Sequence, residues 1–242
     1  MKVLVISDIH ANLTALEAVL SDADKFDTVW CLGDLVGYGP DPNECVDIVQ
    51  KLPNLVCLLG NHDAAALGLI ETDSFNPDAR AALEWTRNQL SADSISFLRG
   101  LPDHTIIDDV TLAHGSPRQP VWEYVLDTRT ATINFGFFDT KYCFVGHTHL
   151  PVIYNLNHES RTARLTIPDA SKRVTLTPRA IINPGSVGQP RDRDHRAAYG
   201  VYEPELDSFE FCRVPYHIAS VQKRMEAANL PEKHIHRLSA GW

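Results

Sequence analysis

Five apolar stretches of this sequence each end in aspartate, asparagine or histidine, usually beside a glycine. "VLVIS" is followed by Asp8-Ile9-His10, "VWCL" by Gly33-Asp34, "LVCLL" by Gly60-Asn61-His62-Asp63, "VTLA" by His114-Gly115, and "YCFV" by Gly146-His147-Thr148-His149. Ligands of α/β proteins bind at the carboxyl ends of the sheet strands. A glycine there allows a sharp turn and a close approach of the backbone. We therefore expect these polar residues to converge on one spot.

Seven of these side chains offer the donor atoms of a divalent metal site. They are Asp8, Asp34 and Asn61 with oxygen, and His10, His114, His147 and His149 with nitrogen. This set contains no cysteine, is too large for one tetrahedral zinc ion and suits two borderline-to-hard divalent ions. A carboxylate such as Asp34 can bridge two ions. In extended backbone, residues i and i+2 point the same way, so the pairs Asp8/His10 and His147/His149 are each expected to serve one site.

Each motif alone also has an ordinary structural explanation. An Asp-x-His run is commonly a turn or a cap, His114 suits a satisfied core or loop histidine, and Gly-Asn-His-Asp suits a polar turn. Five such motifs, each following a strand, favour the joint metal interpretation over five separate coincidences.

In this order, the motifs resemble the core blocks of the calcineurin-like metallophosphoesterase superfamily, from residue 8 to residue 149. The compact length and the run "INPGSVG" resemble its small bacterial phosphodiesterase branch. The resemblance implies one ion on Asp8, His10 and His149, a second on Asn61, His114 and His147, and Asp34 as the bridge. Manganese, iron and zinc all accept such ligands, and the sequence does not choose among them.

The function that this resemblance implies is a binuclear metal-dependent phosphoric ester hydrolase. It would cleave a phosphodiester by attack of a metal-bridging hydroxide. Phosphomonoester or phosphoprotein hydrolysis and dinucleoside polyphosphate hydrolysis are the alternatives, because the substrate pocket lies in loops. A non-catalytic scaffold, like the retromer subunit that resembles this fold, is disfavoured because every metal position and His62 are present.

The residues after Asn61 suggest the remaining chemistry. We hypothesise that protonated His62 binds phosphate and protonates the leaving oxygen as general acid. Asp63 would hold the other nitrogen of that ring and favour its charged form. Alternatively, Asp63 caps a helix running through Ala64 to Leu67.

Two further stretches suggest substrate contacts. In "NPGSVGQPRDRDHR", residues 183–196, Arg191 or Arg193 is a candidate for gripping a distal phosphate. The alternative is a solvated loop whose arginines and aspartates pair with each other. Tyr38, in the glycine-flanked loop after Asp34, is a candidate for stacking on a base or an aromatic leaving group, or else packs under that loop.

The elements that must position these residues follow from the apolar pattern. "KVLVIS", "TVWCLG" and "LVCLLG" predict strands, and helical spacing predicts helices at about 13–20, 43–52, 77–90 and 91–100. After residue 100 the pattern is strand-rich, with a helix near 128–137 and another over 218–228 that ends in a turn at Pro231. We expect one α/β domain, 1–242: a four-layer α/β/β/α sandwich of two mixed sheets flanked by helices, with a C-terminal helical segment at about 216–242.

Composition limits the partners and the location. The net charge of −9 gives duplex nucleic acid no basic footprint, so a small phosphorylated or nucleotide-type substrate is expected, drawn by local cations. Five cysteines without a CxxC pair indicate a reducing compartment. No stretch is long and apolar enough to cross a membrane or serve as a signal peptide, so a cytoplasmic location is expected.

Overall fold

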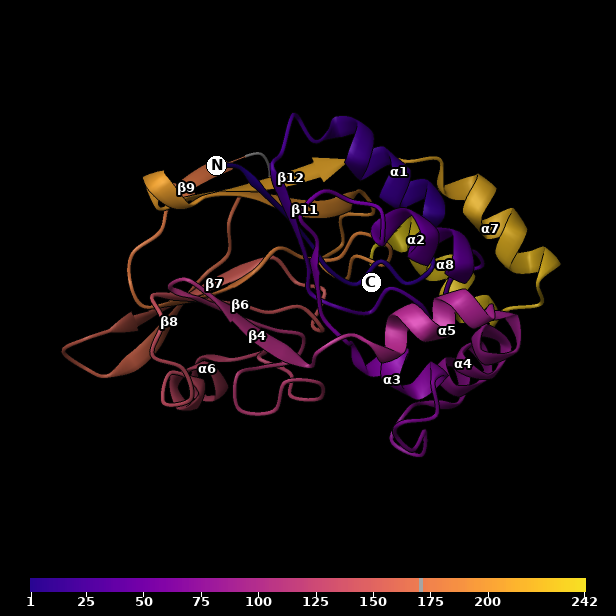
Figure 1. Ribbon diagram of the computed structural model, residues 1–242, viewed down its shortest axis with the longest axis horizontal. Coiled ribbons are helices and arrows are strands. Elements are labelled where there is room, and N and C mark those ends of the chain that lie inside the picture. The colour runs from indigo at the N-terminus through magenta and orange to yellow at the C-terminus, as the bar shows by residue number, and fades with distance from the viewer. Residues whose placement is uncertain (170–171) are drawn as a thin grey trace.

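Two six-stranded mixed sheets lie at the centre of the computed structural model, which describes residues 1–169 and 172–242 (Figure 1). The first sheet has the order β3 (Val56–Cys57), β2 (Thr28–Cys31), β1 (Val3–Ile6), β11 (Ala197–Glu203), β12 (Ser208–Val214) and β9 (Lys172–Thr175). The second has the order β4 (His104–Ile107), β5 (Val110–Ala113), β6 (Tyr142–Phe144), β10 (Ala180–Asn183), β7 (Val152–Asn157) and β8 (Thr162–Thr166).

Helices cover the outer faces of both sheets. They are α1 (Leu13–Asp22), α2 (Pro42–Val49), α3 (Asn61–Ala66), α4 (Pro77–Gln89), α5 (Ala92–Arg99), α6 (Thr128–Asn134), α7 (Ile218–Ala227) and α8 (Glu232–Ala240), with a 3-10 turn at Pro204–Leu206. Figure 1 shows α6 on the outer side of the second sheet and the other helices gathered at the right of the view. None of the helices in the described stretches is long and apolar enough to cross a membrane.

The alternation of side chains along β1 explains the layers. Val3 and Val5 face the core between the two sheets, whereas Leu4 and Ile6 face the core under the helices. A strand whose two faces are both buried must be apolar throughout, as this one is. A third core joins α6 to the outer face of the second sheet. The predicted four-layer α/β/β/α sandwich is therefore confirmed.

Several predicted helix starts are confirmed by their caps. The side chains of Asn12, Asn76 and Ser91 each accept a backbone N–H three residues later, at 3.1, 2.9 and 3.1 Å. The ends were predicted less well. Helix α2 stops at Val49 rather than residue 52, because the approaching Pro53 disfavours helical backbone before it. Helix α6 stops at Asn134 rather than residue 137.

The C-terminal segment holds two helices rather than one helix and a turn. Pro231, expected as a turn, is the N-cap of α8. Val221 and Met225 of α7 and Leu238 of α8 pack into the core under the first sheet's helices. These helices therefore cover part of the sheet end where the polar loops emerge.

Two sets of parallel strands form the end of the sheets where the polar loops emerge. Strands β1, β2 and β3 run parallel to one another, as do β5, β6 and β10. The five motifs follow β1, β2, β3, β5 and β6, so all five leave the sheets at carboxyl ends.

Candidate metal centre

The backbone at the strand ends is unusual for residues other than glycine. Five of the seven candidate ligands have a left-handed backbone: Asp8 (φ 54°), His10 (49°), Asp34 (55°), His147 (64°) and His149 (61°). Such residues are uncommon outside functional sites, where the surrounding structure must hold them. The expectation of extended i, i+2 pairs is therefore wrong. Asp8 and His10 do share one group of donors, but His147 and His149 turn into different groups.

Asp8, His10 and His149 form the first group of facing donor atoms. The Nε2 atoms of His10 and His149 lie 3.1 Å apart. Oδ1 of Asp8 lies 3.3 Å from Nε2 of His149 and 4.0 Å from Nε2 of His10. All three side chains are buried, so solvent does not separate them.

Asn61, His114 and His147 form the second group, and Asp34 lies between the two. Nε2 of His114 is 3.1 Å from Oδ1 of Asn61, 3.2 Å from Nδ1 of His147 and 3.4 Å from Oδ2 of Asp34. The same oxygen of Asp34 is 3.6 Å from Nε2 of His10. One carboxylate oxygen thus faces both groups.

Backbone carbonyls determine which ring nitrogens face the centre. A carbonyl only accepts hydrogen bonds, so each bonded Nδ1 carries a proton, and Nε2 offers a lone pair whenever the ring is neutral. The pairs are His10 with Val36 (3.2 Å), His114 with Leu32 (2.8 Å) and His149 with Gln189 (2.6 Å). Among the described residues, Oδ2 of Asp34 and Nε2 of His147 have no hydrogen-bond partner. Buried lone pairs that face one another fit divalent cations at their centre.

Charge within the cluster is consistent with this donor set. Burial lowers the pKa of His10, His147 and His149 well below the usual range, so these rings are neutral, as metal ligands must be. For His114, burial opposes protonation, but the carboxylate of Asp34 raises its pKa to about 9. Burial of Asp34 is in turn outweighed by the charge of His114, which holds the pKa of that carboxyl well below its usual range. An arriving cation would take the place of this proton.

The run "INPGSVG" supports the loops that carry the candidate ligands. The amide of Asn183 donates to the carbonyl of Gly146 (2.6 Å) and to Oγ1 of Thr148 (3.0 Å). Oγ of Ser186 donates to the backbone carbonyl of Asp8 (2.8 Å). These residues hold the loops after β1 and β6 together. This role could not be read from the sequence, because the partners of the run lie far away in the chain.

Gly60 is required by the close approach of the loops after β2 and β3. A Cβ at this position would lie 2.0 Å from Oδ1 of Asp34 and 2.3 Å from its backbone nitrogen. That Oδ1 accepts the backbone N–H of His62 at 2.9 Å. A side chain at residue 60 would therefore push the shared carboxylate out of place.

Gly60→Ala is expected to lower the free energy of unfolding by about 1–3 kcal/mol, the usual cost of overpacking a core. It should also weaken metal binding, since Asp34 must move. Urea unfolding and metal titration measure the two effects. Gly100→Ala is the control, because Gly100 has an ordinary helical backbone and the nearest atom to an added Cβ is 3.4 Å away. Equal effects of the two substitutions would contradict the conclusion that Gly60 leaves room for the Asp34 carboxylate.

His62 lies against the first group, within a cluster of rings. Its ring centroid is 4.8 Å from that of His10, 4.4 Å from Tyr38 and 5.1 Å from Phe75. One of its nitrogens faces a carboxylate oxygen of Asp34 within 4.8 Å. Burial lowers the pKa of His62 to about 4, although the charge of Asp34 opposes the shift. The ring is therefore neutral in the free protein at pH 7.

Asp63 does not hold the ring of His62. Its Oδ1 accepts the backbone N–H of Val36, and its Oδ2 accepts the backbone N–H of Gly60, both at 3.0 Å. The predicted contact with the His62 ring is not formed. The alternative role of Asp63 as a helix cap is observed, but Asp63 lies inside the helix and not before it. Helix α3 begins at Asn61, and Asp63 caps it from its third residue. Asp63 thereby ties the loop after β2 to the loop after β3.

Of the two candidate arginines, Arg191 lies at the edge of the metal centre, where it contacts Gln189. Its Nη2 donates to Oε1 of Gln189 at 2.9 Å, and the backbone carbonyl of Gln189 holds the ring of His149. The positive charge of Arg191 also contributes to the lowered pKa of His149, after burial. Arg193 is exposed, and its backbone N–H donates to the carbonyl of Gly241 at 2.6 Å.

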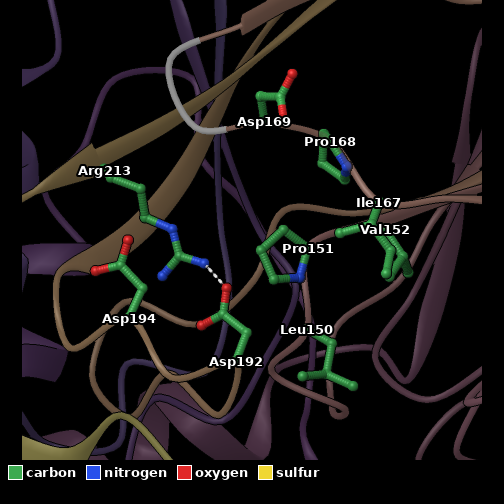
Figure 2. Close-up of a pocket in the computed structure, with 9 residues that line it drawn as sticks. All are labelled: Leu150, Pro151, Val152, Ile167, Pro168, Asp169, Asp192, Asp194 and Arg213. Carbon is green, nitrogen blue, oxygen red and sulfur yellow. Dashed lines mark hydrogen bonds and ion pairs between the residues drawn. The ribbon is translucent and has the colours of Figure 1, made fainter.

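The aspartates of the same loop pair with other arginines. Asp192 pairs with Arg213 of β12, and Asp194 pairs with Arg196 at 2.6 Å. Figure 2 shows Asp192 and Asp194 facing Arg213 in a pocket of about 370 Å³ beside Leu150 and Pro151. The alternative of charge pairing within the loop is therefore confirmed for Asp194 and Arg196, whereas Asp192 pairs with an arginine outside it. These carboxylates make that pocket unsuitable for phosphate.

Of the two alternatives for Tyr38, the structure shows packing under its loop and not an exposed stacking face. It is only 6% exposed, and its ring lies 4.6 Å from that of His10 and 4.4 Å from that of His234. A solvent-exposed aromatic ring beside the candidate ligands belongs to Tyr124, which is 45% exposed and stacks on His147 with ring centroids 3.7 Å apart. Tyr124 was not predicted, because no motif marks an aromatic residue in a loop.

Comparisons with known proteins agree with this geometry. Residues 1–205 match the family model described as the calcineurin-like phosphoesterase superfamily domain. The crystal structure of a metallophosphoesterase from Sphaerobacter thermophilus is 48% identical in sequence and has a TM-score of 0.92, covering 100% of this chain and 99% of that chain.

Two curated relatives differ in how much they share with the chain. An uncharacterized protein from Methanocaldococcus jannaschii is 36% identical over 99% of this chain and 98% of its own length. A symmetrical bis(5'-nucleosyl)-tetraphosphatase from Pectobacterium carotovorum is 32% identical over only 37% of each chain.

Proposed function

The chain belongs to the calcineurin-like phosphoesterase superfamily and is a phosphoric ester hydrolase. We propose that it cleaves phosphodiesters with the help of two divalent ions. One ion would be held by Asp8, His10 and His149, the other by Asn61, His114 and His147, with Asp34 shared. The observation that carries the proposal is the pair of buried donor groups that face a single carboxylate oxygen.

The two ions, when bound, would supply Lewis acidity toward the phosphoryl oxygens and an activated water at neutral pH. The protein's own contribution is to hold the donors before the substrate arrives. Backbone carbonyls orient the three Nε2 ligands, and burial excludes competing water. Asn61 adds a neutral ligand, which keeps negative charge away from an anionic phosphate.

His62 is the proposed general acid. Its ring is neutral in the free protein, and an anionic phosphate beside it would raise its pKa and favour the protonated form. Contacts with His10, Tyr38 and Phe75 restrict its orientation. Protonation of the leaving oxygen by this ring would complete the cleavage.

The test is hydrolysis of a chromogenic phosphodiester beside the corresponding monoester. Protein stripped with a chelator should be inactive and should regain diester cleavage with manganese, iron or zinc. A preference for the monoester would favour a phosphatase instead. Absence of turnover with every metal and both esters would contradict the proposal.

Metal removal is also expected to lower stability. Ions that bind only the folded state stabilise it by about 2.7 kcal/mol at a hundredfold excess over Kd. Removing them also leaves buried lone pairs facing one another. Thermal unfolding of stripped and reloaded protein measures the difference, and an unchanged midpoint would contradict a metal site among these residues.

A second candidate is hydrolysis of dinucleoside polyphosphates. It is supported by the partial similarity to a bis(5'-nucleosyl)-tetraphosphatase and by the exposed ring of Tyr124 next to His147, which offers a face for base stacking. Comparing kcat/KM for diadenosine tetraphosphate with that for the chromogenic diester ranks the two candidates.

A further inference from the structure

Helix α8 carries a second arginine to the edge of the metal centre. Nη1 of Arg237 lies 3.4 Å from Oε1 of Gln189, the same oxygen that accepts Nη2 of Arg191 at 2.9 Å and its Nε at 3.3 Å. The backbone carbonyl of Gln189 holds the ring of His149. One residue therefore links two guanidinium groups to a candidate metal ligand.

Within the described residues neither of these guanidinium groups forms an ion pair, although the charge of Asp78 is near enough to raise the pKa of Arg237. In the part of the chain that the structure describes, Nε of Arg237 is buried without a hydrogen-bond partner. The carboxylates of Asp192 and Asp194 face Arg213 in the pocket of Figure 2. Burial and the neighbouring charge of Arg191 lower the pKa of Arg237, as expected for two cations brought together.

Hydrogen bonding and close packing hold helix α8 against the loop that carries Arg191. The backbone N–H of Arg193 donates to the carbonyl of Gly241, the C-cap of α8, at 2.6 Å. Gly241 has φ 67°, and a Cβ there would lie 2.9 Å from the backbone of Asp194. Ile235 and Leu238 anchor the helix in the core. The end of α8 is thus held against the loop that carries Arg191.

We propose that Arg191 and Arg237 form a subsite for a second phosphate group, adjacent to the phosphate held at the metal centre. This inference rests on the proposed function and names its substrate class: molecules with linked phosphates, such as nucleoside polyphosphates or inorganic polyphosphate. Two guanidinium groups suit such an anion because each offers several charge-assisted hydrogen bonds. The family model ends at residue 205, so Arg237 lies outside the matched residues.

The test compares binding of pyrophosphate and orthophosphate to the metal-loaded protein by isothermal titration calorimetry. The wild type should prefer pyrophosphate, and Arg237→Gln and Arg191→Gln should each reduce that preference about tenfold, the effect of one lost charge-assisted hydrogen bond. Arg237→Lys should restore part of it. Lys233→Gln is the matched control, because Lys233 is an exposed cation on the same helix. An unchanged preference in both arginine variants would overturn the subsite.

A second pair of ligands identifies the source of the phosphate and separates this inference from the proposed function. If ADP binds more tightly than AMP by the same factor as pyrophosphate binds more tightly than orthophosphate, the subsite accepts nucleotides. Tighter binding of pyrophosphate without tighter binding of ADP indicates inorganic polyphosphate. Tighter binding in either pair of ligands supports the subsite, and equal binding in both pairs would overturn it. If the protein binds linked phosphates more tightly but hydrolyses no ester, the subsite is supported and the proposed function is contradicted. If the protein hydrolyses esters but binds linked phosphates no more tightly, the proposed function is supported and the subsite is contradicted.

Discussion

Asp34→Asn is expected to lower kcat/KM for a phosphodiester by about 10³ or more. One oxygen of Asp34 faces both donor groups, 3.4 Å from His114 and 3.6 Å from His10. Replacing the carboxylate with an amide removes the only charge shared by the two proposed ions. Metal catalysis stabilises the transition state by several kcal/mol, and each 1.36 kcal/mol changes the rate tenfold. Steady-state kinetics at saturating manganese measure the loss.

The control for this prediction is Asp127→Asn. Asp127 is an exposed N-cap whose Oδ1 accepts the backbone N–H of Thr130 at 2.8 Å, and asparagine caps helices equally well. Its activity should equal that of the wild type. An Asp34→Asn protein that is folded and retains more than about a tenth of wild-type activity would contradict a bridging role.

His62→Ala is expected to lower kcat by about 10²–10⁴-fold while both metal ions stay bound. The sequence motifs predict His62 as a general acid and not as a metal ligand, and its pKa near 4 and its ring contacts suit a neutral group that gains a proton beside an anion. The loss should be larger for a diester with an alkyl leaving group than for one with nitrophenolate, which leaves without protonation. Kinetics with both esters and metal analysis of the variant measure these effects.

His104→Ala is the matched control, since His104 is exposed and pairs with Asp103 at the surface. Loss of metal from His62→Ala would instead make His62 a ligand. An equal rate loss for both leaving groups would refute the role as general acid and leave a role in binding.

The residues of the site could be predicted from the sequence, but the backbone conformation of the loops that carry them could not. Apolar runs locate the strands, and the parallel pairing of β1 and β2 brings Asp8 and Asp34 together. The packing of the second sheet on the first then adds His114, which follows β5. The left-handed backbone at Asp8 and His147 could not be read from residue type, because only tertiary contacts hold such residues there. This is why the i, i+2 argument failed for His147 and His149.

At Tyr38 and Asp63 the sequence left two alternatives open, and distant contacts decide between them. Both residues lie within motifs, yet their surroundings come from distant segments. The ring of Tyr38 is covered partly by His234 of α8, and the carboxylate of Asp63 is used by the backbone of Val36. Likewise, nothing near Arg237 in the sequence indicates that α8 folds back onto Gln189. Local patterns predict elements and motifs, whereas side-chain roles depend on such long-range contacts.

Anomalous diffraction from crystals grown with manganese would show whether the seven candidate ligands hold two divalent ions around Asp34. We expect two peaks on either side of the Asp34 carboxylate, one bounded by Asp8, His10 and His149 and the other by Asn61, His114 and His147. Absence of peaks at both positions, or peaks elsewhere with these side chains unliganded, would contradict a two-metal site at these residues.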